Sequence, residues 1–522
     1  MRKTVLFTLL SFVAAEAALA GALAIGNVHF RTITRKAVAI QLDLSWQCAW
    51  KDEVNHDAVW LFAKYSLDDG ESWHHATLRG SGVNPPDYTA GSDEGLDILV
   101  TEDHKGAFIR NTAEGIRSPA TTGLRLVWDL AADGVSSSEN ARLRVFGLEM
   151  VYVPEGPFTA GEESAKLDYA GWAPTRIESP DATNRYGIAA IGLAGAGTNE
   201  DPYRGLHAGL GRPYAITTTA LTNDYPNGYR AFYQMKHKLT RQSYLDFLNT
   251  LTETQRLTLL GYHLRNGSNV FYGDSAAAIV SETLPNGRTF LSNAQPWRTL
   301  VFFGGVAAGY GGDVEMLAYL DWAALRPMTD LEYEKSCRGP NAPVKMEFPW
   351  GLATYGLPSS VVGANTAEEH FGNPYAPANI GGAYGTRIST YPQPNWYAST
   401  DDADAVEAGA SYYGALELAA NGRERCVYTA SGAPTAGTAF SAARYSGLHG
   451  DGELTVEGFS NVTDWPYPQQ NYYSNGPYVS RGGYKNMDIG CSTISGGDTH
   501  MGNNYYDDVV HGIRGVRTAS AQ

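Results

Sequence analysis

The residue best suited to chemistry in the last part of the chain is Cys491, which follows a glycine pair in RGGYKNMDIGCSTISGG, residues 481–497. A cysteine thiolate is both a nucleophile and a ligand for soft metal ions, so this position raises the question of a reactive thiol. The other cysteines, Cys48, Cys337 and Cys426, are distant in sequence, and the chain has no CxxC motif or Cys/His cluster. A structural zinc site is therefore not expected.

The sequence around Cys491, from residue 471 to 510, is rich in tyrosine, asparagine, aspartate, serine and glycine. Tyrosine offers a large rigid contact area and the small polar residues offer adaptable hydrogen bonds, so this composition is typical of binding surfaces. An ordinary loop that covers a core is the alternative. The candidate ligand-binding residues are Tyr472, Tyr473, Asn475, Tyr478, Tyr484, Lys485, Asn486, Asp488, Asn503, Asn504, Tyr505, Tyr506 and Asp507.

The composition excludes some classes of partner. The chain of 522 residues has a formal net charge of −16, and it has no run of five or more lysines and arginines. Nucleic acids and anionic membranes are bound through basic surfaces, so neither is expected as the main partner. The abundance of glycine (58) and tyrosine (32) favours short strands, turns and ordered loops over helical bundles.

The first twenty residues have the features of a secretory signal peptide. Arg2 and Lys3 precede an apolar segment at 5–15, and the Ala-Leu-Ala sequence at 18–20 matches the small-residue pattern of a cleavage site. We expect cleavage after residue 20 and a mature protein that is secreted, periplasmic or displayed at the cell surface. An uncleaved anchor is the alternative. No later segment reaches 18 apolar residues, so no transmembrane segment is expected after cleavage.

Residues 21–149 are predicted to form a β-sandwich, because short strands with alternating apolar and polar residues are separated by turn signals. The expected strands are 37–46, 59–65, 73–78, 123–130 and 141–153. Four tryptophans are interpreted as the core of this sandwich, with a carbohydrate-binding platform as the alternative. They are Trp46, Trp50, Trp60 and Trp73.

Residues 150–522 are predicted to contain few helices and much loop. The expected helices are 239–252, 314–325 and 328–339. Thr240 is a candidate N-cap for the first helix, and Thr329 with Glu332 forms a capping box for the third.

Seven motifs follow one another in this second part of the chain. They are MVYVPEGPFTAG, MKHKLTRQSYLDFLN, LDWAALRPMTDLEYEKSCRG, FPWG, YYGALELAANGRERCV, RGG and GIRGVR. In this order they resemble the formylglycine-generating-enzyme (sulfatase-modifying-factor) family. The resemblance implies, for residues 150–522, an α+β fold of the C-type-lectin-like kind with little regular secondary structure. The preceding β-domain resembles a module that comes before such domains in some secreted bacterial proteins.

The family includes copper-dependent oxidases that convert a sulfatase cysteine to formylglycine, iron-dependent sulfoxide synthases, and non-catalytic members, some of them hypervariable proteins diversified by retroelements. The resemblance implies that the oxidase needs two nearby cysteines after the RGG strand. Cys491 is close to the second position, but Met487 is at or beside the first, and a thioether is a poor substitute for a thiolate. The iron site needs a His-x3-His-x-Glu pattern that this chain lacks. Neither copper nor iron chemistry is therefore expected.

The resemblance also implies a structural calcium site around the segment ELAANGRER. Its implied ligands are Asn365, Glu417, Ala420, Gly422 and Glu424, which offer the carboxylate, amide and carbonyl oxygens that calcium prefers. A solvated acidic turn is the alternative. In an oxidising compartment, a disulfide between Cys337 and Cys426 is a further hypothesis, since both lie in core motifs.

The sequence thus favours a non-catalytic protein that binds a protein or glycan through its Tyr/Asn/Asp-rich segment. The GIRGVR sequence that follows this segment matches the placement of the closing strand in the hypervariable members of the family. A copper-dependent oxidase acting on a sulfatase cysteine and a structural component of the cell surface are the alternatives.

Overall fold

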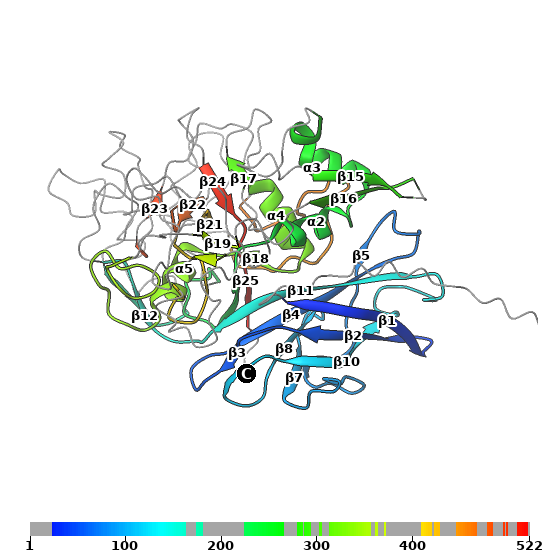
Figure 1. Cartoon of the computed structure of the whole chain (residues 1–522), viewed down its shortest axis with the longest axis horizontal. Coiled ribbons are helices and arrows are strands. Elements are labelled where there is room, and N and C mark those ends of the chain that lie inside the picture. The colour runs from blue at the N-terminus through cyan, green and yellow to red at the C-terminus, as the bar shows by residue number, and fades with distance from the viewer. Residues whose placement is uncertain are drawn as a thin grey trace, which may run out of the picture.

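The computed structural model is a mostly β protein whose described part contains four short helices, and this confirms the expected α+β class. Figure 1 shows the strands of the first 150 residues stacked beneath the helices of the later part. The structure describes residues 23–162, 174–180, 224–265, 279–284, 287–293, 302–304, 313–355, 361–363, 370–371, 409–419, 422–427, 445–466, 478–483, 494–495, 497–498 and 509–519.

An antiparallel three-stranded sheet forms the outer layer of the molecule, in the order β1-β2-β10. Its strands are β1 (Ala24–Thr34), β2 (Ala37–Ser45) and β10 (Ala120–Asp129). The strand pattern at 37–46 correctly predicted β2, whose residues Val38, Ile40 and Leu42 are fully buried. These side chains share one core with residues of a second, larger sheet, so the two sheets pack face to face.

The larger sheet has nine strands and runs through both predicted domains, in the order β18-β25-β14-β11-β4-β8-β7-β6, with β5 paired to β4. Its strands are β4 (Asp57–Ser66), β5 (His74–His75), β6 (Gly82–Val83), β7 (Leu96–Val100), β8 (Ala107–Asn111), β11 (Arg142–Val153), β14 (Phe232–Met235), β18 (Arg326–Pro327) and β25 (Gly515–Thr518). Strand β11 pairs with β4 over residues 142–151 and with β14 over residues 150–153. The boundary expected between residues 149 and 150 falls inside this strand, and the sheet continues across it.

Strand β4, with the sequence DAVWLFAKYS, is buried along its whole length because it separates two cores. Side chains alternate between the faces of a strand. Val59, Leu61 and Ala63 therefore face the three-stranded sheet and join what we call the outer core. Trp60 and Phe62 face the opposite way and join the inner core, which contains the helices of the later part.

The four tryptophans expected in one core are distributed differently, and that part of the prediction is wrong. Trp46 lies in the outer core. Trp60 lies in the inner core, where its Nε1 donates to the carbonyl of Ala323 at 3.0 Å. Trp50 and Trp73 are only partly buried, and Trp50 packs against a third core formed by the later part of the chain.

The four helices are α2 (Arg241–Leu248), α3 (Glu253–Arg265), α4 (Asp313–Trp322) and α5 (Asp330–Arg338). The expected N-cap of α2 is confirmed, since Thr240 accepts a hydrogen bond from the backbone of Ser243 at 3.1 Å. The capping box of α5 between Thr329 and Glu332 is also confirmed. Helix α3 was not predicted from the sequence.

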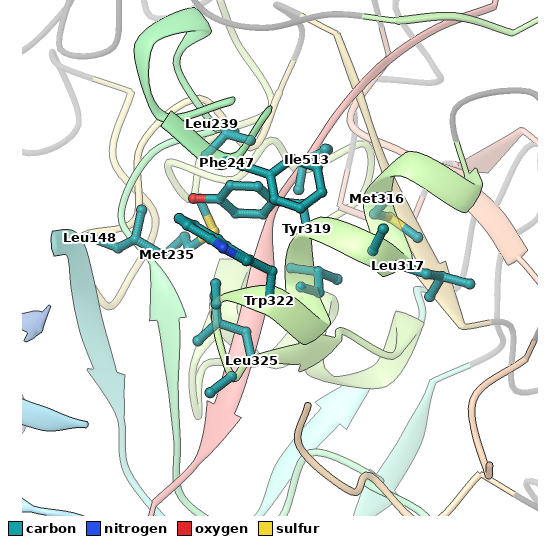
Figure 2. Close-up of a cluster of buried hydrophobic side chains, with 14 of the residues drawn as sticks. Leu148, Met235, Leu239, Phe247, Met316, Leu317, Tyr319, Trp322, Leu325 and Ile513 are labelled. Carbon is teal, nitrogen blue, oxygen red and sulfur yellow. The ribbon is translucent and has the colours of Figure 1, made fainter. Parts of the chain in front are cut away.

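The inner core joins the helices to the large sheet. Figure 2 shows Phe247 from α2 beside Tyr319 and Trp322 from α4, together with Met235 from β14 and Ile513. Phe247 and Trp322 have ring centroids 5.4 Å apart in an edge-on arrangement, which is favourable for aromatic pairs. The helices are thus fixed on the face of the sheet that carries Trp60 and Phe62.

A second sheet in the later part has five strands, in the order β17-β24-β21-β22-β23. Its strands are β17 (Phe302–Gly304), β21 (Arg423–Val427), β22 (Tyr478–Arg481), β23 (Gly497–Asp498) and β24 (Val509–Gly512). Four two-stranded pairs complete the described strands: β3 (Ala49–Lys51) with β9 (Gly115–Arg117), β12 (Phe158–Ala160) with β13 (Thr175–Ile177), β15 (Ile279–Thr283) with β16 (Thr289–Asn293), and β19 (Val361–Val362) with β20 (His370–Phe371). Within the described ranges, none of the helices has the length and apolar character needed to cross a membrane.

Candidate functional site

The sequence motifs of the later part meet around the five-stranded sheet. Helix α5, strands β21, β22, β24 and β25, and the loop at 409–419 contribute most of them, and we call this group of elements the motif frame. The backbone of Thr329, just before α5, forms a parallel bridge with Val427 of β21, and β24 is followed after two residues by β25. Segments that are more than eighty residues apart in sequence, such as α5 and β21, are therefore neighbours in the fold.

The arginine of the RGG motif belongs to a buried ionic network on α5. Arg481 lies 3.7 Å from Asp330 and 3.5 Å from Glu334, while Arg338 lies 3.4 Å from Glu334 and 2.7 Å from Glu347. All five side chains are almost completely buried. Breaking one partner of such a network leaves an uncompensated charge in the interior, so its role is to hold β22 against α5.

A second buried ionic group, which we call the Lys238 centre, joins the GIRGVR motif to the ELAANGRER segment. The ammonium of Lys238 lies 2.8 Å from Oε1 of Glu424 and also donates to the backbone carbonyl of Glu417. Arg514 approaches the same Glu424 oxygen with its Nε at 3.3 Å. Burial lowers the pKa of Lys238 and raises the pKa of Glu424, because both charged forms lose their hydration.

Two side-chain cations lie beside the described oxygen donors of the implied calcium site. Calcium binds six to eight oxygen ligands. Here one Glu424 oxygen contacts two cationic side chains, and the Glu417 carbonyl accepts from the ammonium of Lys238. A divalent cation at these atoms would lie beside Lys238 and Arg514 and would be repelled by both. Gly422 is buried near this group, whereas Asn365 and Ala420 lie outside the described residues.

The two cysteines of the motif frame are free thiols, so the hypothesised disulfide is not present. Cys337 on α5 and Cys426 on β21 both lie in a hydrophobic core that also contains Val479. Burial raises the pKa of each thiol well above its ordinary value. Since the thiolate is the reactive and metal-binding form, neither residue is suited to nucleophilic or copper chemistry. Cys491 lies outside the described residues.

One predicted ligand-binding residue can be placed, and it is not at the surface. Tyr478 of β22 is fully buried, and its hydroxyl donates to the carbonyl of Pro466 at 2.7 Å. The expectation that it is exposed was wrong, because it occupies a strand rather than the preceding loop. The other candidates lie outside the described residues: Tyr472, Tyr473, Asn475, Tyr484, Lys485, Asn486, Asp488, Asn503, Asn504, Tyr505, Tyr506 and Asp507.

Sequence reasoning missed the two cations of the Lys238 centre. It named Glu417 and Glu424 as oxygen donors but assigned no role to Lys238 or Arg514. The signal was present, because both residues belong to motifs that were identified, MKHKLTRQSYLDFLN and GIRGVR. Acidic and basic residues in neighbouring motifs of one frame are candidates for a buried pair before they are candidates for a metal site.

No protein-family model matches this chain, and no curated protein matches it. The likeness to the formylglycine-generating-enzyme family therefore rests on the order of the seven motifs.

Proposed function

We propose that this chain is a non-catalytic binding protein, secreted or displayed at a bacterial cell surface, whose later part is a sulfatase-modifying-factor-like domain of the C-type-lectin-like kind. Its ligand is a protein or a glycan. The ligand-binding residues are the tyrosines, asparagines and aspartates of the segments 467–477, 484–493 and 499–508. The N-terminal β-domain serves as the support that presents this later part.

The observation that carries the proposal is how these three segments are attached. Each begins and ends next to described residues of the five-stranded sheet or its close contacts. Segment 467–477 lies between Pro466 and β22, segment 484–493 between Gly483 and Ile494, and segment 499–508 between β23 and β24. The flanking residues Pro466, Gly483 and Ile494 are all buried. A rigid frame that presents binding residues on the segments between its elements is the usual construction of a binding surface.

The chemistry of the frame also supports a binding role. Many of its charged side chains are engaged in the α5 network and the Lys238 centre, and its two described cysteines are buried thiols. Among the residues that the structure describes in the frame, these charged groups of the identified motifs therefore hold the fold together. An oxidase would have to use Cys491 without either Cys337 or Cys426.

The proposal is tested with the mature protein and a variant in which Asn503, Asn504, Tyr505 and Tyr506 are all changed to alanine. Binding is measured on a glycan array and to immobilised bacterial surface proteins. We expect at least about a tenfold loss of affinity in the variant, with an unchanged melting temperature. A matched control replaces two exposed tyrosines of the frame region, Tyr355 and Tyr412, by alanine and should bind like the parent.

The oxidase alternative is tested separately. The protein is incubated with copper(I) and a cysteine-containing sulfatase peptide, and aldehyde formation is followed by mass spectrometry. We expect no aldehyde. Formation of an aldehyde that is abolished by Cys491→Ser would overturn the binding proposal.

A further inference from the structure

The Lys238 centre includes a backbone carbonyl as well as the ion pair between Lys238 and Glu424. The side chain of Lys238 is fully buried, and so is the carboxylate of Glu424 that it contacts at 2.8 Å. The backbone of Glu417 adopts a φ of 62°, in the left-handed region that a glutamate rarely occupies. This conformation accompanies the hydrogen bond from the Lys238 ammonium to the Glu417 carbonyl. A single ammonium thus connects a carboxylate and a carbonyl from two separate segments.

Two motif glycines make room for this pair. A Cβ atom on Gly512, the first glycine of GIRGVR, would lie 2.7 Å from Cδ of Lys238. A Cβ atom on Gly482, in the RGG motif, would lie 2.5 Å from Oε2 of Glu424 and 2.3 Å from the carbonyl oxygen of Leu418. Distances this short are not tolerated between real atoms, so both positions exclude a side chain. The glycines of two separate motifs therefore shape the space that holds Lys238 and Glu424.

Arg514 completes the positive charge of the centre. Besides contacting Glu424, its guanidinium donates to the carbonyls of Leu416 and Met235, each at 2.6 Å, and of Lys236 at 3.0 Å. Backbone carbonyls and carboxylates are the same kinds of donor that surround calcium in protein sites. Here two side-chain cations, Lys238 and Arg514, contact these backbone carbonyls and Oε1 of Glu424.

We infer that Lys238 and Arg514 act as a built-in cation centre, so that this part of the fold is stable without a calcium ion at Glu417 and Glu424. The centre links the loop at 409–419 to β21 and to the start of β25, which is the linkage that a structural ion would otherwise provide. This inference is independent of the proposed binding function, since it concerns how the frame is held and not what the frame binds.

The inference is tested first on the unmodified mature protein. Its melting temperature is measured by differential scanning fluorimetry in millimolar calcium and in excess chelator. We expect a difference below about 1 °C, because an ion that does not bind the native state does not stabilise it. A rise of several degrees in calcium that disappears in the Glu424→Gln variant would overturn the inference.

The second test removes the ammonium. Lys238→Met should lower the melting temperature by roughly 5 °C or more, since it leaves the Glu417 carbonyl without this donor and Glu424 with one cation instead of two. The double variant Lys238→Met with Glu424→Gln should recover part of this loss, because no buried carboxylate is left undercompensated. An unchanged melting temperature in Lys238→Met would contradict the role of the ammonium. If Lys238→Met does not fold, the double variant and the comparison with and without calcium still test the inference.

The matched control is Lys335, another buried lysine. Its ammonium donates to the carbonyls of Pro154 at 2.6 Å and Tyr229 at 3.1 Å. Lys335→Met should also lower the melting temperature, but adding Glu424→Gln to it should give no recovery. Recovery in both backgrounds would mean that Glu424→Gln stabilises the protein for a reason unrelated to Lys238.

Discussion

The outer core and the motif frame are both packed interiors, but they contain different kinds of side chain. The outer core contains aliphatic and aromatic side chains from regular strands, and its backbone groups are paired in sheet ladders. The motif frame contains many buried charges. Among the described residues, every buried arginine lies after residue 240. The two regions are therefore stabilised by different groups, although both are fully packed.

The two regions contain different side chains because their backbone carbonyls find hydrogen-bond donors in different ways. Every buried carbonyl needs a hydrogen-bond donor. Parts of the later region, such as the loop at 409–419, are neither helix nor ladder, so lysine and arginine side chains supply donors there. Arg514 donates to the carbonyl of Leu416 at 2.6 Å, Arg517 to that of Ala324, and Lys335 to those of Pro154 and Tyr229. A fold with little regular secondary structure thus needs buried cations that a sandwich does not need.

The largest expected effect comes from Arg514, which serves three carbonyls and Glu424. Arg514→Met should lower the free energy of unfolding by about 4 kcal/mol, because it leaves several buried acceptors unsatisfied and weakens the compensation of a buried carboxylate. Arg514→Lys should recover little, since an ammonium cannot reach all the acceptors that the planar guanidinium serves. Denaturant unfolding measures both. Full stability in Arg514→Lys would show that charge alone matters at this position.

A substitution in the outer core should behave differently. Leu61 is fully buried between the two sheets, and Leu61→Ala should lower the free energy of unfolding by about 3 kcal/mol through the cavity it leaves. The conservative change Leu61→Met should cost less than about 1.5 kcal/mol, because an apolar core tolerates a swap of similar volume. Ile116→Ala, at a residue that is 71% exposed, is the control and should be nearly neutral. If Leu61→Met is as damaging as Arg514→Lys, the contrast between the two regions fails.

One partly buried carboxylate of the later part, Glu315, should destabilise the protein at neutral pH. Glu315 lies in the first turn of α4, and burial raises its pKa to about 7. Because the folded-state pKa is above the unfolded value, the protonated form is favoured by folding. The stability from that preference is present at low pH and is lost as the pH rises from about 4.5 to about 7.

Glu315→Gln should therefore stabilise the protein at pH 8 by about 2 kcal/mol, after allowance for the favourable position of an acid at a helix N-terminus. At pH 4 the substitution should be nearly neutral. Denaturant unfolding at the two pH values measures the difference. Asp313→Asn is an informative comparison, because Asp313 is paired with Arg425 at 2.6 Å and its neutralisation should destabilise instead. Equal effects of Glu315→Gln at both pH values would mean that ionisation of the Glu315 carboxylate does not cause the change in stability.

The strands and caps were the parts of the fold that local patterns could predict. Alternation of apolar and polar residues predicted β2 and β10, and the capping box predicted the start of α5. The strand β4 was expected to lie in a sandwich with a single core. Its near-continuous apolar sequence is instead typical of a strand covered on both sides. Which second layer covers it depends on contacts with residues more than two hundred positions away, such as Ala323.

Less of the candidate site than of the fold could be predicted from the sequence. Glu424 was found as a carboxylate, but the groups that neutralise it are Lys238 and Arg514, which are 186 positions before it and 90 positions after it. A local motif shows neither partner, and a carboxylate without visible cations suggests a metal. Tyr478 was misplaced for a related reason: composition predicts a binding loop but does not locate the residue at which the loop becomes a buried strand.

The smallest expected effect concerns the contact between the β4–β5 hairpin and the loop at 445–466. Nδ1 of His74 lies 3.2 Å from Oε2 of Glu453, and this hydrogen bond raises the pKa of His74. The folded pKa is above the unfolded one, so the stabilisation is fully present below about pH 6.5 and is lost as the pH rises through the folded value. Both side chains are substantially exposed, at 49% and 39%, so the contribution should be only about 0.5 kcal/mol. His74→Gln should lower stability at pH 5.5 and have almost no effect at pH 9, while His29→Gln in the exposed strand β1 should have no effect at either pH. An effect of His74→Gln that is equal at both pH values would assign it to packing, and the charged contact between the two parts of the molecule would then contribute nothing.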